Sequence, residues 1–537
     1  MRFLTCLVFL AFLCPAVFGD EGHQHQLTDQ EIGSVHFMTS CAKSVEQNFN
    51  HGVALLHSFQ YEQARSVFED VARQDAHCAM AMWGVAMSHY HGLWDNGDTA
   101  AGRVALKKAQ ALASENTGTT AREKAYIDAL AEIYREDGKD VPTHARAFEQ
   151  KMGEVQAAYP DDTEAAIFHA VTLAITAPKT DKTFSNQRKC GEILEPIFAK
   201  QPQHPGVAHY IIHCYDNPAL AERGLPAARA YAKIAPASAH ANHMPSHIFT
   251  RTGLWDESIA SNRRSADLAA AAESGSKNGE ARDQRLHALD YLEYAYLQSG
   301  RMQQAKAVLD EMNSLPQTEG LTLTGNYGLA AIPARYAVET HDWKQASGLK
   351  AQPNLVPWAE AISWTAIGVG SARLGDASRA AEAEKKLSSL RDATSKQNNQ
   401  YWANQIEVQR LEVAAWISQS AKESNDSLQL LRSATELEES MDKHAVTPGA
   451  VTPAREMLAD MLMLQKQPQE ALTEYRSVLS VAPNRFNALY GAASAAQAAG
   501  NSPVAAQYYQ KLLSIAGESE RPEVAEARAK LALSAQK

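Results

Sequence analysis

Residues 471–517 read ALTEYRSVLSVAPNRFNALYGAASAAQAAGNSPVAAQYYQKLLSIAG and contain one helical unit twice. A small residue is followed by an aromatic residue, then by an apolar residue and a helix-ending residue, each four positions further on. The unit recurs after 34 residues, in the order Ala471, Tyr475, Leu479, Pro483 and then Ala505, Tyr509, Leu513, Gly517. Spacing of four places side chains on one helical face, the small residue admits a second helix, and Pro or Gly ends the unit. The stretch therefore predicts pairs of antiparallel helices.

Weaker copies of this unit precede the stretch and centre on Tyr61, Gly253, Gly300, Trp343 and Trp364. A period of 34 is the length of the tetratricopeptide repeat (TPR), and the chain resembles TPR proteins over most of residues 45–520. It is most similar to exported bacterial TPR proteins with no assigned activity. The resemblance implies an all-α fold, a right-handed α-solenoid of about ten TPR-type helical hairpins.

The chain divides by composition into five segments. Residues 1–19 are predicted to be a signal peptide, since Arg2 precedes an apolar run and Gly19 is small enough for cleavage. Residues 20–35 are expected to be a flexible N-terminal segment. Residues 36–352 form a His-rich helical-repeat region with degenerate repeats, and residues 353–520 form a more regular TPR region. Residues 521–537 are read as a C-terminal helix or tail.

Charge and cysteine content indicate which partners and which cellular compartment to expect. The formal net charge of −11 argues against nucleic acid as a partner. No stretch after residue 19 is long and apolar enough to be an integral membrane segment of the mature chain. Outside the predicted signal peptide, the disulfide candidates are Cys41, Cys78, Cys190 and Cys214. Four cysteines allow three connectivities, and sequence proximity favours Cys41–Cys78 and Cys190–Cys214. We expect a periplasmic or secreted protein.

Histidines concentrate in two short stretches, HPGVAHYIIHCYD at 204–216 and HANHMPSH at 240–247. His209 and His213 lie four apart and share a helical face, and so do His243 and His247. Pro245 suits a first helical turn, so His240 is expected to precede the second helix. Asp216 is a further ligand or an acceptor that fixes an imidazole tautomer. The sequence thus predicts a transition-metal site of these four histidines and Asp216, with Zn or Cu as the metal.

Two alternatives remain open for this region. The pocket could be a metal-free ligand groove lined by His204, His240 and Arg251, or the histidines could serve packing alone. The sequence contains no H-E-x-x-H, G-x-S-x-G, P-loop or G-x-G-x-x-G motif.

We therefore expect an exported TPR scaffold that binds a protein, a peptide or a small ligand in its concave groove and carries the His-rich metal site. The alternative is a metal-dependent hydrolase or oxidase that uses that site.

Overall fold

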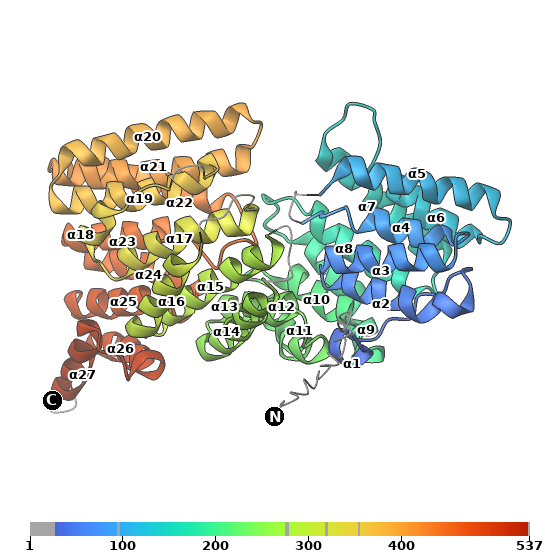
Figure 1. The fold of residues 1–537 in the computed structure, drawn as a ribbon. Helices are drawn as coiled ribbons and strands as arrows, with labels where there is room; N and C mark the ends of the chain where they lie inside the picture. Colours follow the sequence, from blue (N-terminus) through green and yellow to red (C-terminus); the bar gives the residue numbers. More distant parts are fainter. Residues whose placement is uncertain (1–26, 94–96, 274–278, 317–320, 353–354, 535–537) are drawn as a thin grey trace, which may run out of the picture.

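The computed structural model describes residues 27–93, 97–273, 279–316, 321–352 and 355–534. Within these ranges every regular element is a helix, and consecutive helices pack as hairpins, which confirms the predicted all-α fold of helical hairpins (Figure 1). Among the same residues, no helix combines the length and apolar content needed to cross a bilayer. The predicted signal peptide lies outside the described residues.

The N-terminal part of the chain runs from blue through teal to green in Figure 1. Its helices are α1 (Asp29–Ile32), η1 (Lys43–Val45), α2 (Glu46–His57), α3 (Tyr61–Gln74), α4 (Ala79–Met87), α5 (Thr99–Glu115), α6 (Ala121–Ala131), α7 (Val141–Ala158), α8 (Thr163–Thr176), α9 (Ser185–Lys200), α10 (Pro205–Tyr215) and α11 (Ala221–Ile234).

The middle part follows in green. Its helices are α12 (Ala239–His243), α13 (Pro245–Thr252), α14 (Trp255–Ala272), α15 (Glu280–Gln298) and α16 (Met302–Ser314). The C-terminal part runs from yellow to red. Its helices are α17 (Leu323–Glu339), α18 (Trp343–Gly348), α19 (Pro357–Leu374), α20 (Ala377–Lys396), α21 (Gln400–Ser420), α22 (Ser424–Glu439), α23 (Ala454–Leu464), α24 (Pro468–Val481), α25 (Phe486–Ala498), α26 (Ser502–Ala516) and α27 (Pro522–Ser534).

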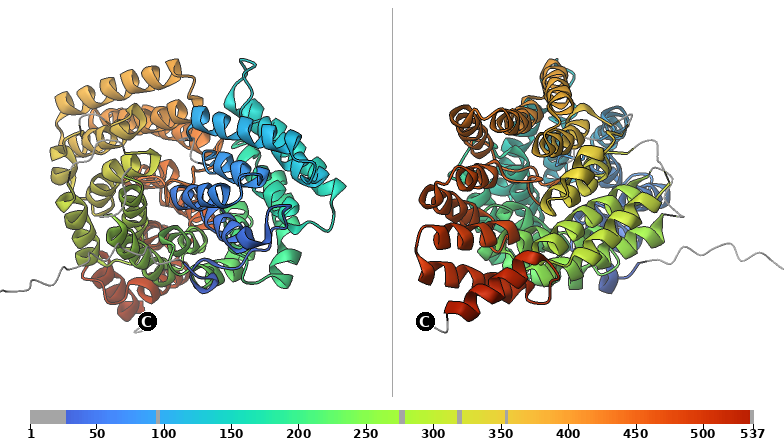
Figure 2. Two further views of the ribbon diagram at one scale, coloured as in Figure 1. Left: turned by 45° about the vertical axis from the view of Figure 1, so that its right-hand side comes forward. Right: turned by 90° about the vertical axis from the view of Figure 1, so that its left-hand side faces the viewer.

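The repeated unit of the sequence marks the second helices of two successive hairpins. Ala471 and Tyr475 are buried on α24, and Ala505 and Tyr509 are buried on α26. A Cβ atom added at Gly491 of α25 would overlap the Tyr475 ring, so glycine lets these two helices meet closely. The right-hand view of Figure 2 shows the C-terminal helices stacked in layers.

The apolar core forms three main clusters along the chain. One extends from Ile32 to Phe249, a second from Trp255 to Ile332, and a third from Tyr327 to Ala527. Ile32 of α1 is fully buried, so the described end of the predicted flexible segment packs on the fold. The boundary proposed at residue 353 is based on how regular the repeats are, whereas the boundaries between the apolar clusters lie near residues 250 and 330.

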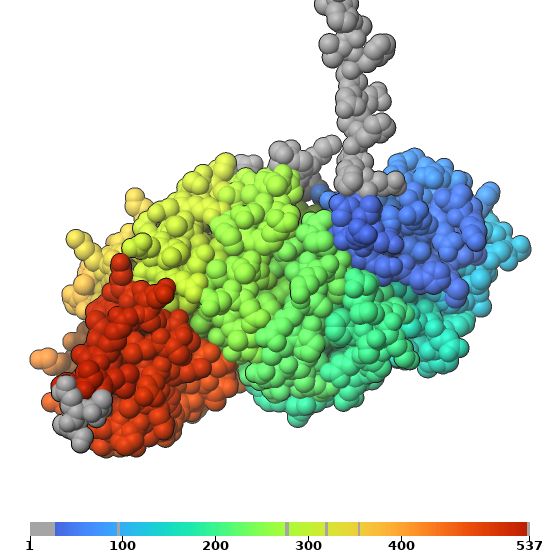
Figure 3. Space-filling model, turned by 90° about the horizontal axis from the view of Figure 1, so that it is seen from below, coloured from blue at the N-terminus to red at the C-terminus, as the bar shows by residue number. Residues whose placement is uncertain are grey.

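The three parts pack on one another. Seen from below, the green helices form a continuous surface between the blue and red parts (Figure 3). The Trp255 indole donates to the Asn484 carbonyl oxygen (2.9 Å), which joins the start of α14 to the turn before α25. Residues 440–453, between α22 and α23, lie against α13 and α15; we call them the covering loop. A segment from far along the chain therefore covers α13 and α15 at these contacts.

Candidate metal centre

Six histidines come together on the first helices of three successive hairpins. They are His209 and His213 of α10, His240 and His243 of α12, His247 of α13 and His287 of α15, and we call them the centre histidines. All are buried except His213, which is partly exposed. The two four-apart pairs predicted from the sequence therefore do converge, and two further histidines join them.

Local sequence places these helices. The His204 side chain caps α10 by accepting the Val207 amide (3.3 Å), and Pro205 fits the first turn. Ser238 caps α12 by accepting the Ala241 amide. His240 precedes the helix that begins at Pro245, as expected, but it lies inside a short helix of its own, α12. Pro245 has no N–H to donate to the preceding turn, so the helical hydrogen bonding is interrupted at Met244, although Met244 keeps right-handed helical dihedrals.

The first triad consists of His209, His213 and His240. The Nε2 atom of His209 lies 3.0 Å from Nε2 of His213 and 3.0 Å from Nε2 of His240. Its Nδ1–H donates to the backbone oxygen of His57 (2.6 Å), so its Nε2 carries the lone pair. The His209 ring stacks on Tyr231, and Phe59 lies against all three imidazoles. The aromatic walls hold the triad in one orientation.

The second triad consists of His243, His247 and His287. His243 Nδ1 lies 2.7 Å from Oδ1 of Asn262, whose amide nitrogen donates to the Ser258 carbonyl oxygen (2.8 Å). The Asn262 oxygen is therefore the acceptor, and His243 Nδ1 carries a proton. His247 Nδ1–H donates to Oδ2 of Asp216 (2.9 Å). Both Nε2 atoms then carry lone pairs, and they face each other at 3.0 Å.

Two facing lone pairs require a cation or a proton between them. Ligand nitrogens around a zinc or copper ion, with bonds of about 2.0–2.1 Å, lie about 3.3–3.6 Å apart. The observed spacing is close to that value, and the ligand atoms of each triad lie within 4.8 Å of one another. The His213 and His247 rings, one from each triad, have centroids 6.2 Å apart. The arrangement is two adjacent three-histidine sites.

Electrostatics keep these imidazoles neutral. Burial, together with repulsion from neighbouring histidines, lowers the pKa of His209, His213, His240, His243 and His287 well below 6.5. Burial also lowers the pKa of His247, although the bond to Asp216 partly opposes it. Neutral imidazole is the form that ligates metals, and its outer N–H is normally held by an acceptor, as it is in His209, His243 and His247.

Asp216 lies behind the second triad and not inside it. Its carboxylate accepts from His247, from Arg251 Nε (2.9 Å) and from Lys443 Nζ of the covering loop (3.0 Å). Burial would raise the pKa of Asp216, but the two cations and the His247 bond together lower it well below its ordinary value. The structure thus places it as the acceptor that orients an imidazole. The Tyr291 hydroxyl bonds to the Ala445 and Thr447 oxygens and fastens the loop.

His204 belongs to a separate buried cluster. Glu164 accepts from His204 Nε2 (2.8 Å) and from His57 Nε2 (3.0 Å). The outer nitrogen of His57 lies 2.9 Å from the Tyr210 hydroxyl, and that of His204 accepts the Val207 amide. With both imidazoles neutral, each ring nitrogen has a complementary partner. This network is complete without a metal, in contrast to the centre histidines.

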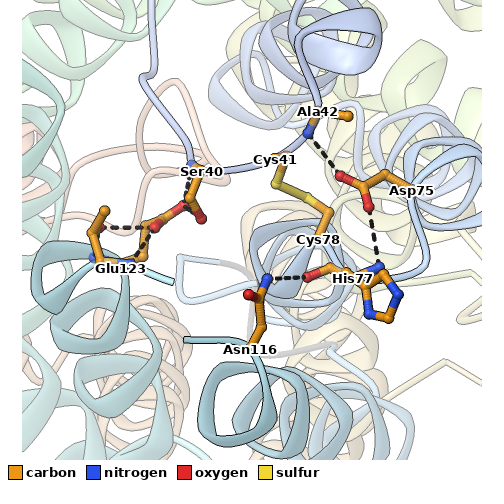
Figure 4. The surroundings of a disulfide bond; sticks show 9 residues. Ser40, Cys41, Ala42, Asp75, His77, Cys78, Asn116 and Glu123 are labelled. Atoms are coloured by element: carbon orange, nitrogen blue, oxygen red, sulfur yellow. Dashed lines mark hydrogen bonds between the residues drawn. A yellow bond between two sulfur atoms is a disulfide. The ribbon is translucent and has the colours of Figure 1, made fainter. Parts of the chain in front are cut away.

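Both disulfides favoured by sequence proximity are present. The Cα atoms of Cys41 and Cys78 are 4.8 Å apart, and those of Cys190 and Cys214 are 6.1 Å apart. Figure 4 shows the first bond with Asp75, whose carboxylate accepts the Ala42 amide (2.7 Å). Asp75 lies near both sulfurs, but bonded sulfurs are not available as thiolate ligands. Two disulfides fit an oxidising compartment.

Arg251 also lines a cavity of about 780 Å³. The cavity lies between α19, α21, α22 and the covering loop, and aromatic residues dominate one wall. The sequence predicted Arg251 beside a ligand groove, and its guanidinium is held there by Asp216 and Asp442.

Sequence reasoning missed His287 and His57. His287 is a single histidine on α15 and has no histidine four residues away. It could have been found from its position on the first helix of the following hairpin, with Tyr291 one turn further along. His57 contributes a backbone oxygen to His209, which no side-chain pattern announces.

No protein family model and no curated protein sequence matches the chain. Among solved structures, it is similar to a monomeric IFIT1 mutant with Gppp-AAAA, at 11% identity and a TM-score of 0.35 over 82% of this chain and 90% of that chain. A second IFIT1 mutant with m7Gppp-AAAA gives 11% identity and a TM-score of 0.34, with the same coverage. An overlap of this extent assigns neither ligand nor activity to the chain.

Proposed function

We propose that this protein is an exported helical-repeat scaffold that holds two transition-metal ions, one in each triad of centre histidines. The observation that carries the proposal is the approach of His243 Nε2 and His247 Nε2 to 3.0 Å with both outer nitrogens fixed as donors. A metal ion between these lone pairs turns a repulsive contact into two bonds. Packing alone gives no reason for the same arrangement to occur twice, side by side.

Copper fits the donor set best, and zinc is the alternative. All ligands are neutral imidazoles, which suit copper and zinc and do not suit calcium or magnesium. The one carboxylate beside the second triad, Asp216, is already balanced by Arg251 and Lys443. A buried site with no anionic ligand favours an ion of low charge, and Cu(I) carries half the charge of Zn(II).

The alternative of an enzyme uses the same centre. Copper, when bound, would supply one-electron redox chemistry at two adjacent positions. His213 is partly exposed, so solvent can reach the first triad at this side chain. Asp216 is a weak base because its pKa is held far below neutrality, so a hydrolase would lack a carboxylate base here. An oxidase is therefore favoured over a hydrolase.

A second candidate role is ligand binding in the cavity of about 780 Å³. That volume is typical of sites for small molecules or for a few residues of a peptide. The cavity shares Arg251 and Lys443 with the outer contacts of the second triad, so ligand binding and metal binding could influence each other. Location in the periplasm or outside the cell is supported by the two disulfides and by the predicted signal peptide.

Metal content tests the proposal directly. The mature protein is purified without a His tag, loaded with Cu(I) or Zn(II), desalted and measured by mass spectrometry. We expect two ions per chain, one ion in a His209→Ala/His240→Ala variant, and one ion in a His243→Ala/His287→Ala variant. His77→Ala, which removes an exposed histidine, is the control and keeps both ions. Absence of tight binding, or a stoichiometry that neither double variant changes, would overturn the proposal.

A further inference from the structure

The cavity has one wall of aromatic rings. Trp358 of α19 and Trp402 of α21 stack with ring centroids 4.5 Å apart and planes inclined by 18°. The Tyr327 ring lies 6.4 Å from Trp358 and 6.3 Å from Trp402. All three residues line the cavity. Such a wall accommodates the hydrocarbon part of a ligand and attracts a cation placed over its rings.

Beside this wall, α21 presents two acceptors that the protein does not use. Gln409 and Glu412 lie three residues apart on the same helical face and both line the cavity. Glu412 is only 3% exposed, and within the part of the chain that the structure describes its carboxyl group has no hydrogen-bond or ion-pair partner. The side-chain oxygen of Gln409 is buried and has no partner either. A buried amide oxygen without a partner, next to a carboxyl group that is 3% exposed and unpaired, indicates a ligand that donates hydrogen bonds.

None of the positive side chains that line the cavity in the described structure forms an ion pair with Glu412. Arg251 and Lys443 are held by Asp216, and Arg455 is held by Glu439 and Glu474. Glu438 of α22 lines the cavity next to Glu412 and accepts the Ala454 amide (3.0 Å). Arg251, Lys443 and Arg455 are thus already paired, Lys182 lies at an exposed position of the cavity lining, and Glu412 has no ion-pair partner among the described residues.

Both acids are poised to ionise when a cation arrives. Burial, and then repulsion from Glu438, raises the pKa of Glu412 well above its ordinary value. Burial raises the pKa of Glu438 to about 7. A neutral ligand would leave these acids protonated, while a positive charge between them would favour the carboxylate forms.

We propose that the cavity binds a protonated amine or a guanidinium group, with Glu412 as its ion-pair partner, Gln409 as a second acceptor and Trp358 and Trp402 as the stacking wall. The group belongs to a small molecule or to a Lys or Arg side chain of a peptide. The proposal deepens the ligand-binding role of the cavity and rests on it, but it does not depend on the metal.

Calorimetric titration of the mature, full-length protein tests the ligand class. The probes are cadaverine and agmatine, the uncharged and anionic counterparts pentanediol and glutarate, and the tripeptides Ala-Lys-Ala and Ala-Arg-Ala. We expect the cations to bind with a change in tryptophan fluorescence, and pentanediol and glutarate not to bind. Preference for the diamines identifies a small molecule, and preference for the tripeptides identifies a peptide.

Two variants and a control make the test specific. Glu412→Gln keeps the shape of the protonated acid and is expected to lower cation affinity about ten- to a hundredfold. Gln409→Leu should weaken binding by a smaller factor. Glu436→Gln, at an exposed position of α22, should leave affinity unchanged.

Glutarate binding as tightly as cadaverine, unchanged affinity in folded Glu412→Gln, or no binding of any cationic probe would overturn the proposal. Metal content is measured on the same samples. Loss of cation binding with two ions retained contradicts only the cavity proposal, and cation binding without metal contradicts only the metal proposal.

Discussion

Replacing Asp216 by asparagine tests how the second triad is supported. The Asp216 carboxylate accepts from His247, Arg251 and Lys443, at 2.9, 2.9 and 3.0 Å. Asparagine keeps one acceptor oxygen but turns the other position into an N–H donor, which would face a cation. It also removes the charge that balances Arg251 and Lys443.

The size of the effect follows from burial. The Asp216 side chain is 7% exposed and its cationic partners are 10% and 14% exposed. Removing one partner of a buried ion pair costs about 3–5 kcal/mol. Because Arg251 keeps Asp442 at 3.4 Å, we expect the lower end, about 3 kcal/mol, for the free energy of unfolding. Loss of the acceptor behind His247 should weaken metal binding at the second triad about ten- to a hundredfold.

The assay combines urea unfolding of the metal-free protein with metal titration of the folded protein. Asp442→Asn is the matched control, because Asp442 contacts the same arginine at a longer distance (3.4 Å) and is 19% exposed, so it should cost less than Asp216→Asn. Adding Lys443→Met to Asp216→Asn removes the unpaired ammonium and should restore part of the stability. Equal effects of Asp216→Asn and Asp442→Asn on both the free energy of unfolding and metal affinity would contradict this role of Asp216.

Three further outcomes are expected. Glu164→Gln should destabilise the protein by about 1–3 kcal/mol, because the amide NH2 would face one of the two buried imidazole N–H groups and leave it without an acceptor, while metal analysis should show both ions retained. The free energy of unfolding of the metal-free protein should decrease as the pH falls below about 6.5. The centre histidines have lowered pKa values in the folded state, so the unfolded chain binds protons at a higher pH than the folded chain does. The expected loss is about 1.4 kcal/mol per pH unit for each imidazole that stays neutral, and pH-independent stability between 7 and 5.5 would contradict the assignment. A Cys190→Ser/Cys214→Ser variant should lose about 3 kcal/mol, as expected for a bond that closes a short loop, and a variant as stable as the native protein in denaturant would count against that bond.

Much of the fold could be predicted because local rules decide it. The 34-residue spacing of Tyr475 and Tyr509 required a helical face and a close neighbour, and both rings are buried where two helices meet. The four-apart histidines of α10 share a face for the same reason. These features depend on residues close together in the sequence, where helical geometry leaves few alternatives.

The remainder of the site depends on contacts between distant segments. Lys443 contacts Asp216 although it lies 227 positions further along the chain, and no periodic pattern in the sequence predicts that the covering loop packs there. His287 joins His243 because two first helices are adjacent, and only a model of hairpin stacking could supply that neighbour. His204, expected in a groove, is buried instead, because Glu164 of α8, on the preceding hairpin, offers it a carboxylate.

The most direct measurement is a crystal structure of the copper-loaded protein with anomalous scattering recorded at the copper edge. We expect two peaks, each about 2.0 Å from the Nε2 atoms of one triad, His209, His213 and His240 or His243, His247 and His287. A single peak, peaks at other side chains, or no peak with the imidazoles unchanged would contradict this expectation.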